Sequence, residues 1–423
     1  MQKSKNAYSK RGIIILCSVI YFVSYFSRKD FAAVMAGMIT EGAVSRANAG
    51  LIGTMLFAFY GVGQLLSGYL GDKIKPKHLI LIGLSATAVC NIAMPFVSEV
   101  MMIIIWGVNG LAQAMLWPPI VKMLSTYLDH KTYVTANLIV TSAAHFATVL
   151  LYAYVPLCLS FMSWQTVFYT ASLLALLSIV IFVIAMIFVL PGEGKAGESG
   201  DVSPDVDDAV KCSGNSEKIL PVLRKSGIFT VFICIIVLGF LRDGIESWLP
   251  MLYSEAFSKD VSESTLVSII LPLFSIVSIS VVTVLHRRHV LENEVKGSAI
   301  LFTLSLLMAI PLVFFLSIDG TFFRIASLII TALICGSMHG VNFLLISCLP
   351  GRFAKNGRSA TVSGICNSCV YIGAAISTYG IALISERMGW TATAVSWCVI
   401  LAIGVVFAIL SYRRYTNMIK SEG

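Results

Sequence analysis

Long uninterrupted apolar stretches recur along the chain, and they constrain its fold more than any other feature. A helix needs about 20 apolar residues to cross the hydrocarbon core of a bilayer. Barrel strands alternate over roughly 10 residues, so these longer, continuous runs argue against a β-barrel. The sequence therefore predicts an all-α membrane protein with twelve transmembrane helices. They are expected at about 12–38, 46–71, 79–98, 101–127, 133–160, 164–191, 226–253, 262–286, 296–317, 322–349, 357–385 and 389–412.

Composition and the start of the chain agree with this prediction. Only 12% of the 423 residues are charged, 57% are hydrophobic and the mean hydropathy is +0.87, whereas soluble domains are roughly 25% charged. Lys10 and Arg11 precede the first span as in a signal peptide, but no small-residue cleavage site follows it. An uncleaved first helix is therefore expected.

The basic residues are distributed unevenly over the predicted loops. Of the 30 lysines and arginines, we place 22 at the two termini and in every second loop, four on the opposite side and four within spans. Basic residues concentrate on the cytoplasmic side of membrane proteins. We therefore expect both termini in the cytoplasm and the protein in the plasma membrane. The net charge of +8 then reflects topology beside anionic lipid, with no nucleic-acid partner.

The predicted spans fall into two groups of six. Residues 192–224 between them combine acidic residues with glycine and serine, and such a segment cannot bury a core. The predicted organisation is a six-helix bundle at 1–191, a cytoplasmic linker at 192–224 and a second six-helix bundle at 225–423. Transporters built from parallel repeats bind substrate between the repeats near the membrane midplane.

Two arginines lie at matched depth in the two halves. Arg28 and Arg242 each lie 17 residues after a basic residue that opens the span, Arg11 and Lys225. A guanidinium among lipid tails costs at least ~3 kcal/mol. Each arginine is therefore expected to face a protein interior or a water-filled cavity and to meet an anion there.

Polar side chains flank both arginines. Tyr21, Tyr25 and Arg28 share one helix face, and two phenols beside a guanidinium suit an oxyanion; a stripe of core aromatics is the alternative. Arg242 has Asp243 and Glu246 beside it, so a structural ion pair is the alternative there.

His145 in the fifth span can titrate near neutral pH beside an anion site, or it is a hydrogen-bonded core residue. His339 and Asn342 are weaker candidates of the same kind.

Enzyme and ATPase motifs are not found. The sequence has no G-x-x-x-x-G-K-[ST], H-E-x-x-H or G-x-S-x-G, which favours a secondary transporter over an enzyme. The ten cysteines are scattered, and Cys366 and Cys369 lie within a predicted helix, where apolar packing is the favoured role. No metal or cofactor is expected.

The loop after the second span reads Gly68-Tyr-Leu-Gly-Asp72-Lys73-Ile-Lys75-Pro76-Lys77. It resembles a signature of the major facilitator superfamily. Gly68 permits close helix approach, and Asp72 with Lys73 would form a conformational latch between helices. Pro76 and Lys75 depart from the signature.

The chain as a whole resembles the organophosphate:phosphate antiporter family. The resemblance implies that Arg28 and Arg242 grip substrate phosphate, with Tyr21, Tyr25, Tyr60, His145 and Tyr371 around it. The stretches that carry it are Tyr21–Phe31, Tyr60–Asp72, Gly110–Lys122 with Trp117-Pro118-Pro119, Ala144-His145, Arg242–Pro250 and Tyr371–Gly373.

Three residues depart from the family pattern. Gln64 stands where the family usually has a lysine, and Asp243 and Glu246 stand where its best-known members are uncharged. A less charged phosphoester, a carboxylate or a zwitterion then becomes compatible with the site.

These observations predict a monomeric transporter of a small organic anion, favouring a phosphorylated metabolite moved in exchange for phosphate or with a proton. Gln64 is expected to complete the substrate cavity. One alternative is a proton-coupled symporter or exporter, with Asp30, Asp243 or Glu246 as the proton carrier. Another is a sugar-phosphate sensor that does not transport.

Overall fold

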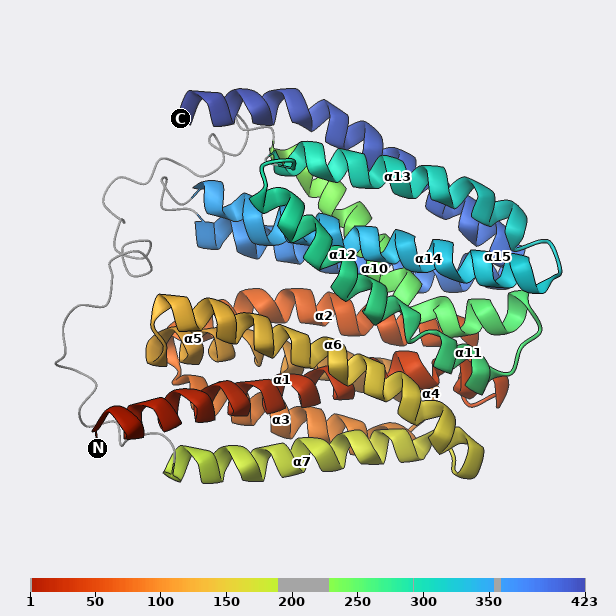
Figure 1. Ribbon diagram of the computed structural model, residues 1–423. Helices are drawn as coiled ribbons and strands as arrows, with labels where there is room; N and C mark the ends of the chain where they lie inside the picture. Colours follow the sequence, from red (N-terminus) through yellow and green to blue (C-terminus); the bar gives the residue numbers. More distant parts are fainter. Residues whose placement is uncertain (1, 189–227, 292, 354–358, 423) are drawn as a thin grey trace.

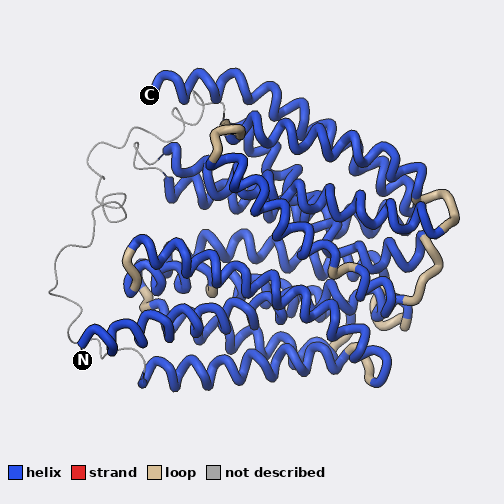
Figure 2. The backbone as a smooth tube through the Cα atoms, viewed as in Figure 1, coloured by secondary structure: helices blue, strands red, loops and turns tan. Residues whose placement is uncertain are grey.

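The computed structural model describes residues 2–188, 228–291, 293–353 and 359–422, and these are helical throughout apart from short loops (Figures 1 and 2). The predicted linker at 192–224 lies outside the described residues. The first half contains α1 (Gln2–Thr40), α2 (Arg46–Lys73), α3 (Pro76–Ala93), η1 (Met94–Phe96), α4 (Glu99–Ala114), α5 (Trp117–Tyr127), α6 (His130–Phe161) and α7 (Gln165–Phe188). The second contains α10 (Ile228–Ala256), α11 (Val261–Val267), α12 (Ile270–Arg287), α13 (Glu294–Phe315), α14 (Thr321–Asn342), η2 (Phe343–Cys348), η3 (Leu349–Phe353) and α15 (Ser359–Glu422).

Eleven of the described helical segments are long and apolar enough to cross a membrane, where the sequence predicted twelve. The difference arises in α15, because the predicted spans 357–385 and 389–412 form one continuous element. α15 contains two helices joined at Gly389, whose φ of 82° and ψ of 178° are not helical. Only glycine adopts such a φ without strain. The count of twelve transmembrane helices stays a prediction.

The helices before and after residues 189–227, which the structure does not describe, gather into two halves (Figure 1). Within the second half, α10 and α15 pack backbone against backbone. A β-carbon on Gly239 would lie 2.0 Å from the Val370 carbonyl oxygen, and one on Gly373 would lie 2.0 Å from that of Ile236. Because no larger residue fits there, these glycines fix the α10–α15 contact, close to Arg242 and Tyr371.

The two halves meet closely at one end of the molecule and separate toward the other, where α1 begins and α15 ends (Figure 1). At the closed end, Arg46 of α2 pairs with Glu255 of α10, and Trp390 Nε1 donates to Glu255 at 2.7 Å. Between the ends, Thr54 of α2 donates to the Ala375 carbonyl of α15 at 2.7 Å. These contacts seal one side of the interface.

Candidate functional site

A cavity of about 710 Å³ lies between the two halves. Tyr133, at the start of α6, and Arg287, at the end of α12, line it, so it opens toward the separated end of the bundles. All eight residues predicted to bind substrate line this cavity: Tyr21, Tyr25, Arg28, Tyr60, Gln64, His145, Arg242 and Tyr371. The structure therefore brings together residues from α1, α2, α6, α10 and α15.

Arg28 is enclosed by aromatic rings. Its guanidinium carbon lies 4.2 Å from the ring centroid of Tyr25 and 5.0 Å from that of Tyr60, and the Tyr60 and Tyr371 rings are 4.5 Å apart. Such contacts stabilise a cation by about 2 kcal/mol when water is excluded. Within the described part of the chain Arg28 makes no ion pair, and its buried Nε has no hydrogen-bond partner. Its charge is therefore available to an anion.

Arg242 is held differently. Its Nη2 pairs with Asp243 Oδ2 at 2.7 Å, and its Nη1 donates to Asn342 Oδ1 at 2.8 Å. The alternative considered from the sequence, an ion pair with a neighbouring acid, is thus present with Asp243. The positive charge of Arg242 is already balanced by a carboxylate.

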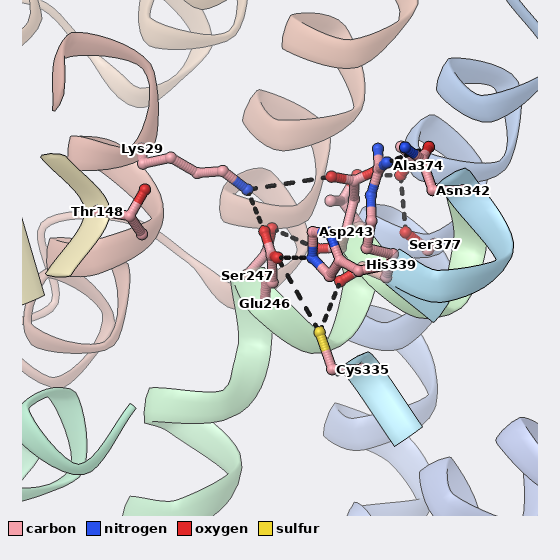
Figure 3. Close-up of polar contacts among 12 residues, drawn as sticks. Lys29, Thr148, Asp243, Glu246, Ser247, Cys335, His339, Asn342, Ala374 and Ser377 are labelled. Atoms are coloured by element: carbon pink, nitrogen blue, oxygen red, sulfur yellow. Dashed lines mark hydrogen bonds and ion pairs between the residues drawn. The ribbon is translucent and has the colours of Figure 1, made fainter. Parts of the chain in front are cut away.

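Lys29 bridges the two halves from α1 (Figure 3). Its Nζ donates to Glu246 Oε2 of α10 at 2.6 Å and lies 4.0 Å from Asp243 Oδ1. The other oxygen of Glu246 is 2.8 Å from His339 Nε2. The Lys29 and Glu246 side chains are only 9% and 15% exposed, so a largely buried ion pair links the two halves.

Sequence reasoning assigned no role to Lys29. A usable signal was present, because Lys29 is a second cation inside the first span and lies one helical turn after Tyr25 on the same face. With Lys29 counted, three cations (Arg28, Lys29 and Arg242) lie beside two carboxylates (Asp243 and Glu246), and Arg287 is a fourth cation in the cavity lining. Two net positive charges remain, and Lys29 supplies a cation where Gln64 brings none.

Histidines from the two halves face each other across the cavity. The rings of His145 and His339 are 6.1 Å apart, and His145 Nδ1 lies 2.9 Å from the Thr141 carbonyl oxygen. Both side chains line the cavity. His339 and Asn342, the weaker candidates for site residues, contact Glu246 and Arg242 respectively.

The remaining predicted residues lie elsewhere. Asp30 is fully buried and is not among the cavity-lining residues, whereas the other two proton-carrier candidates, Asp243 and Glu246, are. The backbone of α2 includes the predicted latch of Gly68, Asp72 and Lys73, but their side chains lie outside the described residues. The latch stays a prediction.

Beyond Arg28 and Lys29 the interface narrows. A separate void of only about 20 Å³ lies there, lined by Trp106 and Trp248 among others. It has room for little more than one water molecule. The cavity therefore ends at the two cations of α1.

The family model of the Major Facilitator Superfamily matches residues 17–378. The chain belongs to the Major Facilitator Superfamily. It is a multi-pass membrane protein of this superfamily, with eleven helices in the described residues that are long and apolar enough to cross a membrane. The family resemblance stated from the sequence is confirmed, because its curated relatives include transporters of phosphorylated compounds.

Three such relatives are informative. A probable hexose phosphate transport protein of Chlamydia trachomatis is 31% identical over 124 residues, 29% of this chain and 27% of the relative. The membrane sensor protein UhpC of Escherichia coli is 28% identical over 125 residues, 29% and 28% of the two chains. The glycerol-3-phosphate transporter of Bacillus subtilis is 24% identical over 270 residues, 60% of each chain. The matches thus span between about a quarter and three fifths of these relatives.

Solved structures agree on the fold. A bacterial homologue of the human lysosomal transporter Spinster, inward-facing and unoccupied, superposes with a TM-score of 0.77 at 14% identity, covering 97% of this chain and 98% of the other. The nucleoside transporter NupG gives a TM-score of 0.72 at 14% identity over 95% and 99%. At such identities the likeness establishes the fold alone.

Proposed function

We propose that this superfamily member transports a small organic anion, a phosphorylated metabolite, in exchange for phosphate. The observation that carries the proposal is the net positive cavity between the halves, with Arg28 at its closed end and without a carboxylate partner among the described residues. A phosphate can accept several charge-assisted hydrogen bonds, and a guanidinium donates two in parallel. Relatives named as hexose phosphate and glycerol-3-phosphate transporters support this substrate class.

In this proposal the two arginines have unequal parts. Arg28 is the anchor for the substrate phosphate, with Tyr21, Tyr25 and Tyr60 around it. Arg242 reaches the same anion from the other half while Asp243 and Asn342 hold its guanidinium. Gln64, His145 and Tyr371 complete the wall.

Anion binding favours closure of the halves. An anion lying between Arg28 and Arg242 attracts both guanidinium groups. Because the two arginines belong to different halves, this attraction draws the halves together. The halves then rock about the site and open the other side, as in other transporters built from repeats. With the termini in the cytoplasm of a plasma-membrane protein, the present cavity faces inward.

Counterflow in proteoliposomes tests the proposal. Vesicles loaded with phosphate are expected to take up labelled glycerol 3-phosphate or glucose 6-phosphate, and empty vesicles are not. Uptake driven by a pH gradient without internal phosphate would instead favour the proton-coupled alternative. Ligand binding without counterflow would favour a sensor, the class named for one relative, UhpC.

A further inference from the structure

We propose that the second half of the molecule holds a binding site for a thiophilic divalent cation of the zinc class, formed by Glu246, Cys335 and His339. This inference goes beyond the proposed function and does not depend on which anion is transported. Among the described residues, these three form the one group whose carboxylate, thiol and imidazole atoms all lie within 4.8 Å of one another.

The geometry is close to that of a metal-bound set. Glu246 Oε1 lies 2.8 Å from His339 Nε2 and 4.0 Å from Cys335 Sγ. A zinc ion about 2.0–2.3 Å from each ligand holds such atoms roughly 3–4 Å apart. To admit the ion, the Glu246–His339 hydrogen bond has to open and the Cys335 sulfur has to move closer to both groups (Figure 3).

The helices place these ligands in advance. Cys335 and His339 are four residues apart on α14 and so lie on one face, and Glu246 faces them from α10 (Figure 3). Cys335 is fully buried, whereas Glu246 and His339 line the large cavity. The cavity thus supplies an entry path, and water from it can complete a fourth position.

The donor set selects the class of ion. One sulfur, one nitrogen and one oxygen suit zinc and similar borderline-soft ions, whereas magnesium and calcium require oxygen ligands. On binding, the Cys335 thiol loses its proton to water and ligates as thiolate, and His339 ligates as the neutral imidazole. A dication that replaces one proton adds one net positive charge to the cavity wall.

The nearby cations Lys29 and Arg242 repel the metal ion, but their carboxylate partners limit this repulsion. Lys29 binds Oε2 of Glu246 and leaves Oε1 to the metal side. Arg242 is balanced by Asp243. Lys29 is therefore the main repulsive group. A Lys29→Met variant is expected to bind zinc more tightly than wild type, a change that a purely structural cluster would not produce.

Cobalt spectroscopy on tag-free, full-length protein tests the site. One equivalent of Co²⁺ should produce tetrahedral visible bands and a thiolate-to-cobalt charge-transfer band, both removed by Zn²⁺ and not by Mg²⁺. Cys335→Ala should abolish the charge-transfer band and weaken zinc binding at least about tenfold, the scale on which even outer partners of metal ligands act. Cys348 is a half-buried cysteine outside the cluster, so Cys348→Ala is the matched control. It should retain the charge-transfer band and the zinc affinity of wild type.

Two results would overturn the proposal: a wild-type protein without the charge-transfer band, or a band that persists in Cys335→Ala. His339→Gln provides a second variant, because glutamine keeps a hydrogen bond to Glu246 and removes the imidazole ligand. Its zinc affinity should also fall at least about tenfold. Unchanged zinc affinity in His339→Gln would contradict the assigned ligand set.

Discussion

The two halves of the molecule present the same residue, an arginine at matched depth, in opposite electrostatic settings. Arg28 is enclosed by the rings of Tyr25 and Tyr60 with no carboxylate partner in the described chain, whereas Arg242 is paired with Asp243 at 2.7 Å. Fold symmetry therefore does not imply equal function. The first half offers an available cation, and the second half offers one that is already balanced and oriented.

The largest expected effect is the loss of Arg28. Arg28→Gln should lower uptake of a sugar phosphate at least about 30-fold, because removing one partner of a desolvated charge pair costs roughly 2–5 kcal/mol. Arg28→Lys keeps the charge and loses the two-pronged donor, so its uptake should lie between those of Arg28→Gln and wild type. Initial rates in proteoliposomes measure both variants. Equal rates for Arg28→Gln and wild type would remove Arg28 from the site.

The next effect concerns the bridge between the halves. Lys29→Met or Glu246→Gln should each destabilise the purified protein by about 1.5–3 kcal/mol, the range for hydrogen bonds to charged groups. The loss of stability is limited because the remaining charge keeps one partner. In Lys29→Met, Glu246 still contacts His339, and in Glu246→Gln, Lys29 still lies near Asp243. The double variant should recover part of the loss, since neither charge is then left unpaired. Additive losses in a double-mutant cycle of thermal stability would contradict direct pairing.

A smaller effect separates the two arginines. Arg242→Gln leaves Asp243 without its main partner, so it should reduce uptake. Adding Asp243→Asn removes the uncompensated charge and should restore uptake about tenfold relative to the single variant, or ~1.4 kcal/mol. Arg28 has no such partner in the described part of the chain, so no matching rescue is expected there. Equal uptake by Arg242→Gln and the double variant would show that Arg242 itself is required.

The smallest effect is expected at the closed end. Glu255→Gln removes the ion pair with Arg46 and keeps an acceptor for Trp390. The Glu255 side chain is 35% exposed, and such pairs contribute about 0.2–1 kcal/mol. The melting temperature should fall slightly at low salt and match wild type at high salt. A large, salt-independent loss would mean that this contact controls the closed end more strongly than its exposure indicates.

The sequence predicts those features that depend on residues close together in the chain, and it misses contacts between distant residues. The position of Arg28 and Arg242 within spans requires only hydropathy, and all eight predicted binding residues line one cavity. The bond from Lys29 to Glu246 joins residues 217 apart in sequence, so no local pattern shows it. The ion pair of Arg242 with Asp243 joins neighbouring residues, so the sequence itself indicates it as an alternative.

Two other differences have physical causes. Asp30 shares its helix with Arg28 but lies at 0% exposure, away from the cavity-lining residues, because residues two apart on a helix point in different directions. The predicted spans 357–385 and 389–412 follow each other within α15, with only the non-helical residue Gly389 between their helices. Hydropathy shows the two apolar runs but not how their backbones connect.

Anion titration of purified protein distinguishes the role of Arg28, as the anchor for the anion, from that of Arg242, as an oriented second contact. Isothermal titration with phosphate and with glucose 6-phosphate compares wild type, Arg28→Gln and Arg242→Gln/Asp243→Asn at one salt concentration. We expect the affinity for both anions to fall at least about 30-fold in Arg28→Gln and to stay within about tenfold of wild type in the double variant. Equal losses in both, or unchanged affinity in Arg28→Gln, would contradict these roles.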